Sequence, residues 1–345
     1  MLKKTQLWLY AYCYTTLLVI VLSFLKRLRM SHNNGLTNVG KIRIVDNPLF
    51  PPHPFLTPGR EFACRLRHAS VSYDDDTILQ VRSSSLKFAD STWDSPLDLE
   101  MNTGAISLFW SARNFIFFFT CQGMVNDLAF STYYDKYPVG LLAGKEGIRR
   151  YPSTFAQMYY HTQTVQYFIG NDGVKRYAKF RLAPADLGPE TGVIPMAELE
   201  NRWVEVAKPG ETLSQNYLKE EYAKRIAAGP VSYHLQIQIH TPAPGDTDEI
   251  FNCSAVWDPA THPWLEVADV TVDRLLTLDE NNEMRYAVNH CPPSLGMIPA
   301  TSIDDYNSIN YMRTASAAAK SSRLFFYNVF GMPKAVPDAR PASTP

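Results

Sequence analysis

The sequence has few cysteines, and no two of them have metal-binding spacing. Five cysteines are scattered over 345 residues, and none forms a C-x-x-C motif. This distribution argues against a disulfide framework and against a cysteine-based zinc site. An excess of basic residues is also missing, because 33 lysines and arginines stand against 34 acidic residues, for a net charge of −1. Nucleic acid is therefore not expected as a partner.

Apolar residues, in contrast, are plentiful. They make up 46% of the chain, whereas charged residues make up 19%. A chain of this length and composition can bury a substantial core, in one large domain or two small ones.

One long uncharged run, LWLYAYCYTTLLVIVLSFL, lies near the N-terminus at residues 7–25. Two lysines precede it, and basic residues follow it. Its length is sufficient to cross a bilayer, which predicts a membrane-associated protein anchored through residues 1–28. Two alternatives remain open. One is a helical arm packed on the protein, which would leave the chain cytoplasmic, and the other is a cleaved signal peptide, for which no small-residue cleavage site follows the run.

Beyond this run the apolar pattern shortens to the period of β-strands. Strand-like segments are residues 41–45, 62–71, 77–89, 104–110, 165–183, 231–242 and 263–276, the fifth of them a hairpin that turns at Asn171-Asp172-Gly173. Helical patterns occupy residues 111–165, 195–210, 213–229 and 316–331. Many antiparallel strands followed by terminal helices favour an α+β fold, with a closed antiparallel β-barrel and helical additions.

The predicted strand 231–242 carries two histidines on one face. His234 and His240 alternate with apolar residues such as Leu235 and Ile237. Two histidines on one strand face can bind a metal, but a barrel strand with one polar face is the commoner explanation. We therefore expect a barrel strand here.

Arg323 and Tyr327 are four residues apart in the predicted helix 316–331 and so share one of its faces. A guanidinium beside a phenol stabilises the phenolate. A phenolate is a suitable ligand for ferric iron, and tyrosine is the axial ligand of catalase haem. Alone, the pair carries little weight, because an arginine and a tyrosine at this spacing usually just pack against each other.

Six segments in the same order along the chain resemble segments of haem catalases. The first is the pattern R-x-x-H-x-x-G-x-x-x-x-G at residues 29–40. The others are CRLRHASVSYDDDTILQVRSSSLKF, SPLDLEMNTGAISLFW, YFIGNDGVKRYAKFRL, VWDPATHPWLEVADVTV and RLFFY. Each match is short, but their common order from about residue 29 to 330 implies a catalase-like β-barrel with a C-terminal helix that carries the proximal ligand.

The resemblance implies roles for individual residues near the iron. His32 corresponds to the distal histidine and Asn102 to the distal asparagine. Tyr327 corresponds to the proximal iron ligand, and Arg323 to the arginine that is paired with it. The implied cofactor is haem b in the ferric state.

The remaining residues that the resemblance identifies would bind the edge and face of the haem. Arg29 and Arg67 match the arginines that hold haem propionates, where charge-assisted hydrogen bonds are expected. Phe115 lies where an aromatic ring stacks near the porphyrin. The haem domain implied in this way covers residues 29–331, and residues 332–345 are expected to be a disordered tail.

Three departures from ordinary catalases point to one branch of the family. The chain is shorter, and no propionate-binding arginine closely follows Tyr327. Ser31 precedes His32 where valine is usual, and its hydroxyl can hydrogen-bond the imidazole and weaken His32 as a base toward hydrogen peroxide. These features, and the stretches RIVDNPLFPPHPFLTPGREF and PPSLGMIPATSIDDYNSINYMR, resemble the catalase-related allene oxide synthases.

This resemblance implies a haem enzyme that converts polyunsaturated fatty acid hydroperoxides to allene oxides or related epoxides. One alternative is a small catalase or haem peroxidase that acts on hydrogen peroxide or organic peroxides. Another is a haem-binding protein without turnover, against which the presence of both distal residues and the proximal pair argues. The expected partners are a peroxide substrate and a membrane, and a homo-oligomer is left open.

Overall fold

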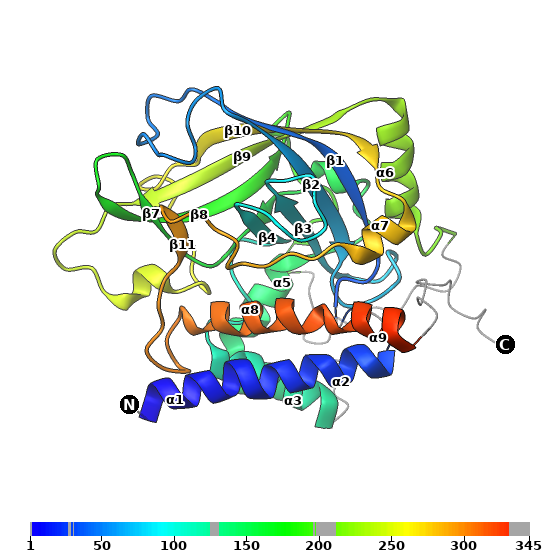
Figure 1. Ribbon diagram of the computed structural model, residues 1–345, viewed down its shortest axis with the longest axis horizontal. Helices are drawn as coiled ribbons and strands as arrows, with labels where there is room; N and C mark the ends of the chain where they lie inside the picture. Colours follow the sequence, from blue (N-terminus) through cyan, green and yellow to red (C-terminus); the bar gives the residue numbers. More distant parts are fainter. Residues whose placement is uncertain are drawn as a thin grey trace.

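The centre of the structure is a closed antiparallel barrel of eight strands (Figure 1). The computed structural model describes residues 2–26, 29, 31–124, 131–195, 197 and 212–330. The strands follow each other around the barrel in the order β1, β2, β3, β4, β6, β8, β9 and β10, and β10 pairs with β1 to close it. Closure leaves no free edge among these eight strands.

The strand bounds are as follows. The barrel strands are β1 Gly35–Ile44, β2 Glu61–Ser70, β3 Gln80–Lys87, β4 Asp98–Thr103, β6 Tyr160–His161, β8 Lys175–Pro184, β9 Val231–His240 and β10 Leu265–Leu275. Three short strands pair at the outside, β5 Ile148–Arg149 with β3, β7 Gln166–Ile169 with β8, and β11 Leu295–Met297 with β7.

The barrel interior is the main hydrophobic core. Side chains that alternate along each strand point inward, including Leu66, Leu86, Met101 and Leu235, and all four are at most 1% exposed. Burial of each such side chain contributes roughly 1.5–3 kcal/mol to folding. The predicted α+β barrel is therefore confirmed.

Most of the predicted strands are found within a few residues of their expected positions, and the hairpin turns at Gly173, whose φ is 73°. The prediction for residues 104–110 is wrong, because β4 ends one residue earlier. Gly104 has a φ of 86°, and a Cβ there would lie 2.8 Å from the Cα of Gly147. This close approach of two backbone segments ends the strand.

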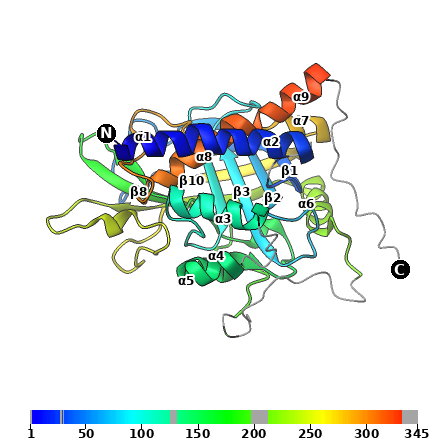
Figure 2. The same ribbon diagram turned by 90° about the horizontal axis from the view of Figure 1, so that it is seen from below.

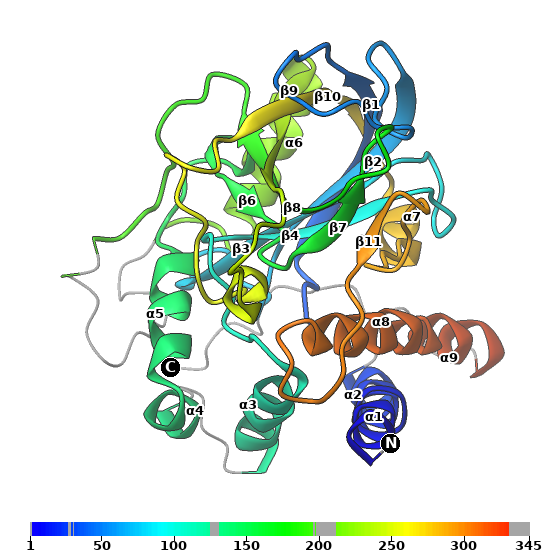
Figure 3. The same cartoon turned by 90° about the vertical axis from the view of Figure 1, so that its left-hand side faces the viewer.

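Helices cover the outside of the barrel (Figure 3). Their bounds are α1 Leu2–Trp8, α2 Thr16–Lys26, α3 Ala112–Met124, α4 Ser131–Lys136, α5 Pro138–Gly147, α6 Tyr217–Ala228, α7 Leu278–Glu283, α8 Ser308–Lys320 and α9 Ser322–Phe330. A π-helical segment, η1 Leu9–Thr15, joins α1 to α2, and two short 3-10 helices are η2 Phe155–Gln157 and η4 Asp248–Phe251.

The N-terminal run does not form the spanning helix that its sequence predicts. It is divided into α1, η1 and α2, which pack as an arm against α8 and α9 (Figure 2). Among the residues with a described position, no helix is long and apolar enough to cross a membrane. The observed arrangement is that of a packed arm, because its own residues Leu7, Ala11 and Val19 are buried on the side that faces the protein.

Two helix predictions differ in extent from the structure, one matches it, and two expectations are not addressed by it. Residues 111–165 were predicted to be mostly helical, but the helices α3, α4 and α5 end at Gly147, and the short strands β5 and β6 follow. The single predicted helix 316–331 is two helices, α8 and α9, of which α8 begins eight residues earlier. The helix predicted at 213–229 matches α6, which ends at Gly229. The helix predicted at 195–210 and the tail 332–345 lie almost wholly or wholly outside the described residues.

Candidate functional site

One outer surface of the barrel, on β1 to β4, is lined with small and polar side chains. Successive side chains along a strand point to opposite faces of the sheet. Since Leu86 of β3 points into the barrel core, its neighbour Ser85 and the residues paired with Ser85 on β2 and β4 point outward. We call this surface the polar outer face and define it by two rows across the strands. The rows are Gly35–Ala69–Ser83–Asn102 and Thr37–Arg67–Ser85–Glu100.

The polar outer face has no room for a side chain at Gly35, on its β1 edge. A Cβ on Gly35 would lie 2.7 Å from the Cβ of Ala69 and 2.9 Å from a guanidinium nitrogen of Arg67. Any larger residue would therefore displace its neighbours on β2. The four strands span about 14 Å, and Thr37, Arg67, Ala69 and Ser83 on this face are buried.

Three arginines from distant parts of the chain meet at the C-terminal end of α7, beside this face. Arg29 donates to the carbonyl oxygens of Asn281 and Met284, each at 2.9 Å. Arg323 of α9 donates to the same Met284 oxygen at 3.2 Å. Arg67 of β2 donates from Nε to Oδ1 of Asn281 at 3.2 Å. The partial negative charge of a helix C-terminus favours cations at this position.

Arg67 is a buried cation for which the described residues supply no acidic partner. Its side chain is 4% exposed, and Nη2 donates to the carbonyl oxygen of Asn33. Burial lowers the pKa of Arg67 to about 10, and Tyr286 partly opposes the shift. Lys87, on the same outer surface of β3, instead bonds both oxygens of Asp98 at 2.9 Å. A buried charge is costly without compensation, so the surroundings of Arg67 suit an anionic ligand.

A second buried polar group near Arg67 has no partner within the described part of the chain. The hydroxyl of Tyr286 is buried and forms no hydrogen bond there. Burial raises the pKa of this hydroxyl, which keeps it protonated as a donor, although Arg67 acts in the opposite direction. A ligand carboxylate that contacts both groups would satisfy them together.

Asn281 fixes α7 over the polar outer face. Its Oδ1 accepts from the hydroxyl of Thr37 at 2.7 Å, and its Nδ2 donates to the carbonyl of Gly35 at 3.1 Å. The helix begins with a capping box, in which Thr277 and Glu280 bond each other's backbone N–H groups. The position of α7 therefore depends on these short polar contacts. The same contacts position the backbone carbonyls that Arg29 and Arg323 bind and the Asn281 side chain that Arg67 binds.

Ser31 and His32 lie just before β1, next to the Gly35 edge. Nδ1 of His32 is 2.7 Å from Oγ of Ser31, and its backbone N–H donates to the carbonyl of Val71 at 2.9 Å. His32 has a φ of 61°, a left-handed conformation that non-glycine residues adopt at a cost. The hydroxyl–imidazole contact expected from the sequence is present, and the backbone holds this histidine in an unusual conformation.

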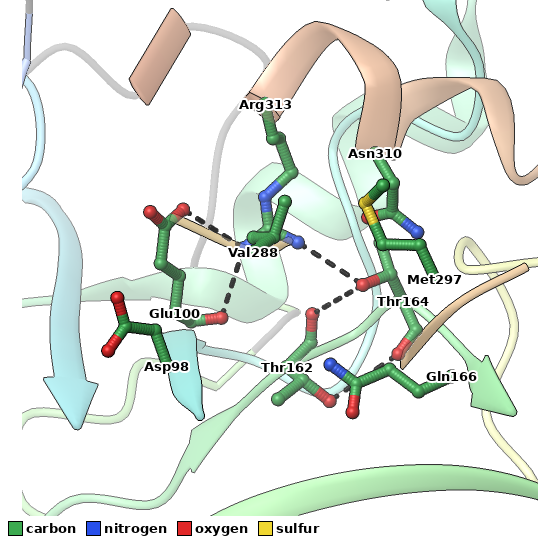
Figure 4. Close-up of a pocket in the computed structure, with 9 residues that line it drawn as sticks. All are labelled: Asp98, Glu100, Thr162, Thr164, Gln166, Val288, Met297, Asn310 and Arg313. Atoms are coloured by element: carbon green, nitrogen blue, oxygen red, sulfur yellow. Dashed lines mark hydrogen bonds and ion pairs between the residues drawn. The ribbon is translucent and has the colours of Figure 1, made fainter. Parts of the chain in front are cut away.

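Asn102 closes the first row of the face on β4, and Arg313 of α8 reaches the same strand. Arg313 donates to the backbone carbonyl of Glu100 at 3.1 Å and to Oγ1 of Thr164 at 3.2 Å (Figure 4). Together with Asp98 it lines a small polar recess. These contacts hold α8 against the strand that carries Asn102.

The other predicted site residues are placed less directly by the structure. Phe115 of α3 packs in an aromatic and aliphatic cluster, with its ring centroid 4.7 Å from that of Phe119 and 5.1 Å from that of Phe109. The backbone of Tyr327 belongs to α9, one turn beyond Arg323, and its side chain lies outside the described residues. The structure thus groups Arg323 with Arg29 and Arg67, and leaves the pairing of Arg323 with Tyr327 a prediction.

The two histidines of β9 belong to separate clusters. Nδ1 of His234 is 2.7 Å from a carboxylate oxygen of Glu266 and 3.2 Å from one of Asp269. His240 contacts His262 and Asp246 at the other end of the strand. They do not form a joint ligand pair, and the inward residues of β9 are core residues, as predicted for a barrel strand.

Sequence reasoning missed the residues that assemble the face from the helix side: Asn281, Tyr286 and Arg313. The T-x-x-E pattern of the capping box at 277–280 could have located α7. Tyr286 and Arg313 carry no local signal, because their roles depend on contacts with β-strands far away in the sequence.

No protein-family model matches the chain. Among curated proteins, the chain is 39% identical over 291 residues to an allene oxide synthase-lipoxygenase protein from Plexaura homomalla. This match covers 83% of the chain and 27% of that protein. The chain is also 29% identical over 293 residues to a linolenate 9R-lipoxygenase from Nostoc sp., and this match covers 81% of the chain and 36% of that protein. The chain therefore spans only about a third of the length of these relatives.

Among solved structures, a bacterial catalase superposes on 95% of the chain with a TM-score of 0.68 and 17% identity, and the match covers 63% of that catalase. At this level of identity the match establishes the fold. The eight-stranded barrel with its helical additions is the catalase fold.

Proposed function

We propose that the chain, which has the catalase fold, is a haem enzyme of the catalase-like proteins that converts polyunsaturated fatty acid hydroperoxides to allene oxides or related epoxides. The similarity to an allene oxide synthase-lipoxygenase protein supports this substrate class. The observation that carries the proposal is the polar outer face. Its small side chains are flanked by three converging arginines, and one of them, Arg67, is buried without an acidic partner in the described residues.

This arrangement fits a planar dianionic cofactor such as haem b. The side of the face without a side chain at Gly35 would lie next to the ring, Arg29 and Arg67 would bind its propionates with Tyr286 as an additional donor, and Arg323 would pair with Tyr327. Tyr327 is the proposed axial ligand. When bound, ferric haem would supply the iron that cleaves the O–O bond of a hydroperoxide.

His32 and Asn102 are the proposed contacts of the peroxide group, because the resemblance to haem catalases assigns them to the distal positions; Asn102 belongs to the first row of the face, and His32 lies three residues before Gly35 of the same row. The amide of Asn102 can donate a hydrogen bond to a peroxide oxygen. If the Ser31 hydroxyl donates to Nδ1, the proton of the neutral imidazole is on Nε2. This nitrogen can then donate to the substrate but cannot accept a proton from it.

The overall reaction needs no external reductant. A fatty acid hydroperoxide that loses one molecule of water has the composition of an allene oxide, so oxidation of the carbon chain balances reduction of the peroxide. A histidine that does not serve as a strong base suffices for this conversion. Splitting hydrogen peroxide, in contrast, requires a base that takes a proton and returns it.

The test is product analysis with purified, haem-loaded protein and a polyunsaturated fatty acid hydroperoxide. We expect an allene oxide, trapped as its hydrolysis products, and little oxygen release from hydrogen peroxide. Rapid oxygen release with an unconsumed lipid hydroperoxide would instead support the small-catalase alternative, which the catalase fold favours.

A further inference from the structure

The N-terminal arm has two different faces, although its sequence is apolar throughout. α1, η1 and α2 follow one another without an intervening loop, because Trp8 and Thr16 at the junctions keep right-handed helical backbone. Together they comprise residues 2 to 26. One face packs on the protein and the other does not.

The packed face follows a spacing of four residues. Leu7, Ala11, Thr15 and Val19 are at most 4% exposed, and Thr15 donates to the sulfur of Met312 in α8. In an ordinary α-helix, positions four apart drift around the axis, since one turn takes 3.6 residues. The wider turns of the π-helical η1 reduce this drift and keep the buried residues in line.

The opposite face exposes large apolar and aromatic side chains. Trp8 is 55% exposed, Leu17 64%, and Val21 and Phe24 44% each. The exposed large hydrophobic residues of the arm are Leu2, Trp8, Leu9, Tyr10, Tyr12, Tyr14, Leu17, Val21 and Phe24. A contiguous exposed surface of this kind marks a site of interaction with another protein or a membrane. We call it the outer stripe.

The outer stripe continues onto α9, next to the arginine cluster. Phe24 contacts the ring of Phe326 with centroids 5.2 Å apart, and Phe325 and Val329 of α9 are 56% and 57% exposed. Arg323, on the same helix, is buried and faces α7. The exposed apolar surface and the proposed haem site are therefore two sides of one helix layer (Figure 2).

The charges around the outer stripe favour an anionic lipid surface over a second protein chain. The first acidic residue of the sequence is Asp46, so the arm carries no acidic group. Lys3 and Lys4 are exposed at its N-terminal end, and Lys26 and Arg27 follow in the sequence at the other end. Tryptophan and tyrosine beside an apolar stripe are typical of segments that lie at the membrane–water interface.

We propose that the outer stripe docks the protein on the surface of a bilayer that contains anionic phospholipids, with the arm lying in the plane of the interface. The choice of a lipid surface rests in part on the proposed function, because a fatty acid hydroperoxide resides in membranes. Docking through α1–α2 and α9 would bring the helix layer that contains Arg323 next to the source of substrate.

Flotation with phospholipid vesicles tests this docking. Full-length protein is mixed with vesicles of phosphatidylcholine, with or without phosphatidylserine. We expect flotation with the mixed vesicles and release by alkaline carbonate, since the arm does not span the bilayer. The double variant Trp8→Glu/Leu17→Glu should reduce the bound fraction at least tenfold. The control Leu49→Glu/Val256→Glu alters two residues of similar exposure outside the arm, 74% and 57%, and should bind like the wild type.

The proposal is overturned if the wild type stays in the aqueous fraction, if the arm variant still floats, or if carbonate fails to extract the protein. A dimer that dissociates in the arm variant, without vesicle binding, would assign the stripe to a second copy of the chain. None of these readouts requires haem or turnover. A protein that binds vesicles but leaves lipid hydroperoxides intact would contradict the proposed function and not the docking.

Discussion

Ser31 is the residue that most directly distinguishes the two peroxide chemistries considered for this site. Its Oγ lies 2.7 Å from Nδ1 of His32, and the left-handed backbone of His32 keeps the two side chains together. The hydrogen bond fixes one ring nitrogen and thereby determines what the other nitrogen can do.

Replacement of Ser31 by valine should release this constraint. We expect the variant Ser31→Val to raise oxygen release from hydrogen peroxide roughly tenfold or more, while turnover of a fatty acid hydroperoxide changes little, because general-base catalysis contributes about 10²–10⁴-fold. The measurement is the ratio of the two rates in haem-loaded protein. The variant Ser31→Thr keeps a hydroxyl and serves as the control. Equal ratios in wild type and Ser31→Val would show that the hydroxyl has no influence on His32.

The cluster of Arg29, Arg67 and Arg323 at α7 shows which site residues the sequence could predict. Arg29 and Arg67 were predicted from spacing that resembles a family, and the structure brings both to the end of α7. Tyr286 was missed, because a buried hydroxyl next to a distant arginine leaves no trace in the local sequence. The roles of His32, Asn102, Phe115 and Tyr327 stay predictions.

At the scale of elements, α7 is short, and its position depends on polar contacts. It has six residues, too few to be stable alone, and tertiary contacts must hold it. Asn281 supplies two of them, to Thr37 and Gly35 of β1, and the capping box stabilises the first turn locally. The arginines that contact its carbonyls are thus positioned indirectly by Thr277.

Loss of this cap should destabilise the protein and loosen the site together. Thr277→Ala removes the side chain that accepts from the Glu280 N–H and should cost about 0.5–2 kcal/mol of unfolding free energy. Haem should also dissociate faster from the variant. Thr247→Ala removes a comparable cap from η4 and is the control. Equal haem release from both variants would mean that α7 does not position the cluster.

Element prediction succeeded where apolar periodicity was strong and failed where polar residues are buried. β9 and β10 show clear alternation and were located within a few residues. The first two turns of α8 were missed, because Ser308 and Asn310 are 0% and 2% exposed and hide its apolar period. The N-terminal run predicted a membrane anchor and left a packed arm and a signal peptide open, because the length of an uncharged run does not distinguish a packed face from an exposed one.

At the scale of the whole molecule, two histidines of the barrel should make stability depend on pH: His68 points into the interior, and His161 points to the outer side, opposite the core residue Tyr160. His68 packs among aromatic rings, 5.3 Å between centroids from Phe155, and contacts the hydroxyl of Tyr233 at 3.0 Å. Burial and the neighbouring Arg67 lower the pKa of His68 to about 3. His161 is affected in the same way, by burial and by three nearby cations, to a pKa of about 3.

The sign of this effect follows from proton binding. In the unfolded chain each of these histidines has a pKa of about 6.5 and binds a proton when the pH is lower. In the folded chain both imidazoles stay neutral until the pH falls to about 3. Unfolding free energy should therefore fall as the pH drops below 6.5, by roughly 2 kcal/mol per histidine at pH 5. Denaturant titrations between pH 7 and 5 measure the slope. His68→Phe should flatten it, and an unchanged slope in this variant would contradict the assignment.

The central claim is that the polar outer face of the barrel binds haem through its arginines. Haem titration of purified wild type, Arg67→Leu and Arg29→Leu/Arg67→Leu, followed by the Soret band, tests it most directly. Lys41→Leu, on the exposed end of β1, is the control. We predict one haem per chain in the wild type and in the control. Each lost charge-assisted bond, worth about 1.5–3 kcal/mol, should weaken binding roughly 10- to 100-fold. No stoichiometric binding by the wild type, or equal affinity in all four proteins, would contradict the account.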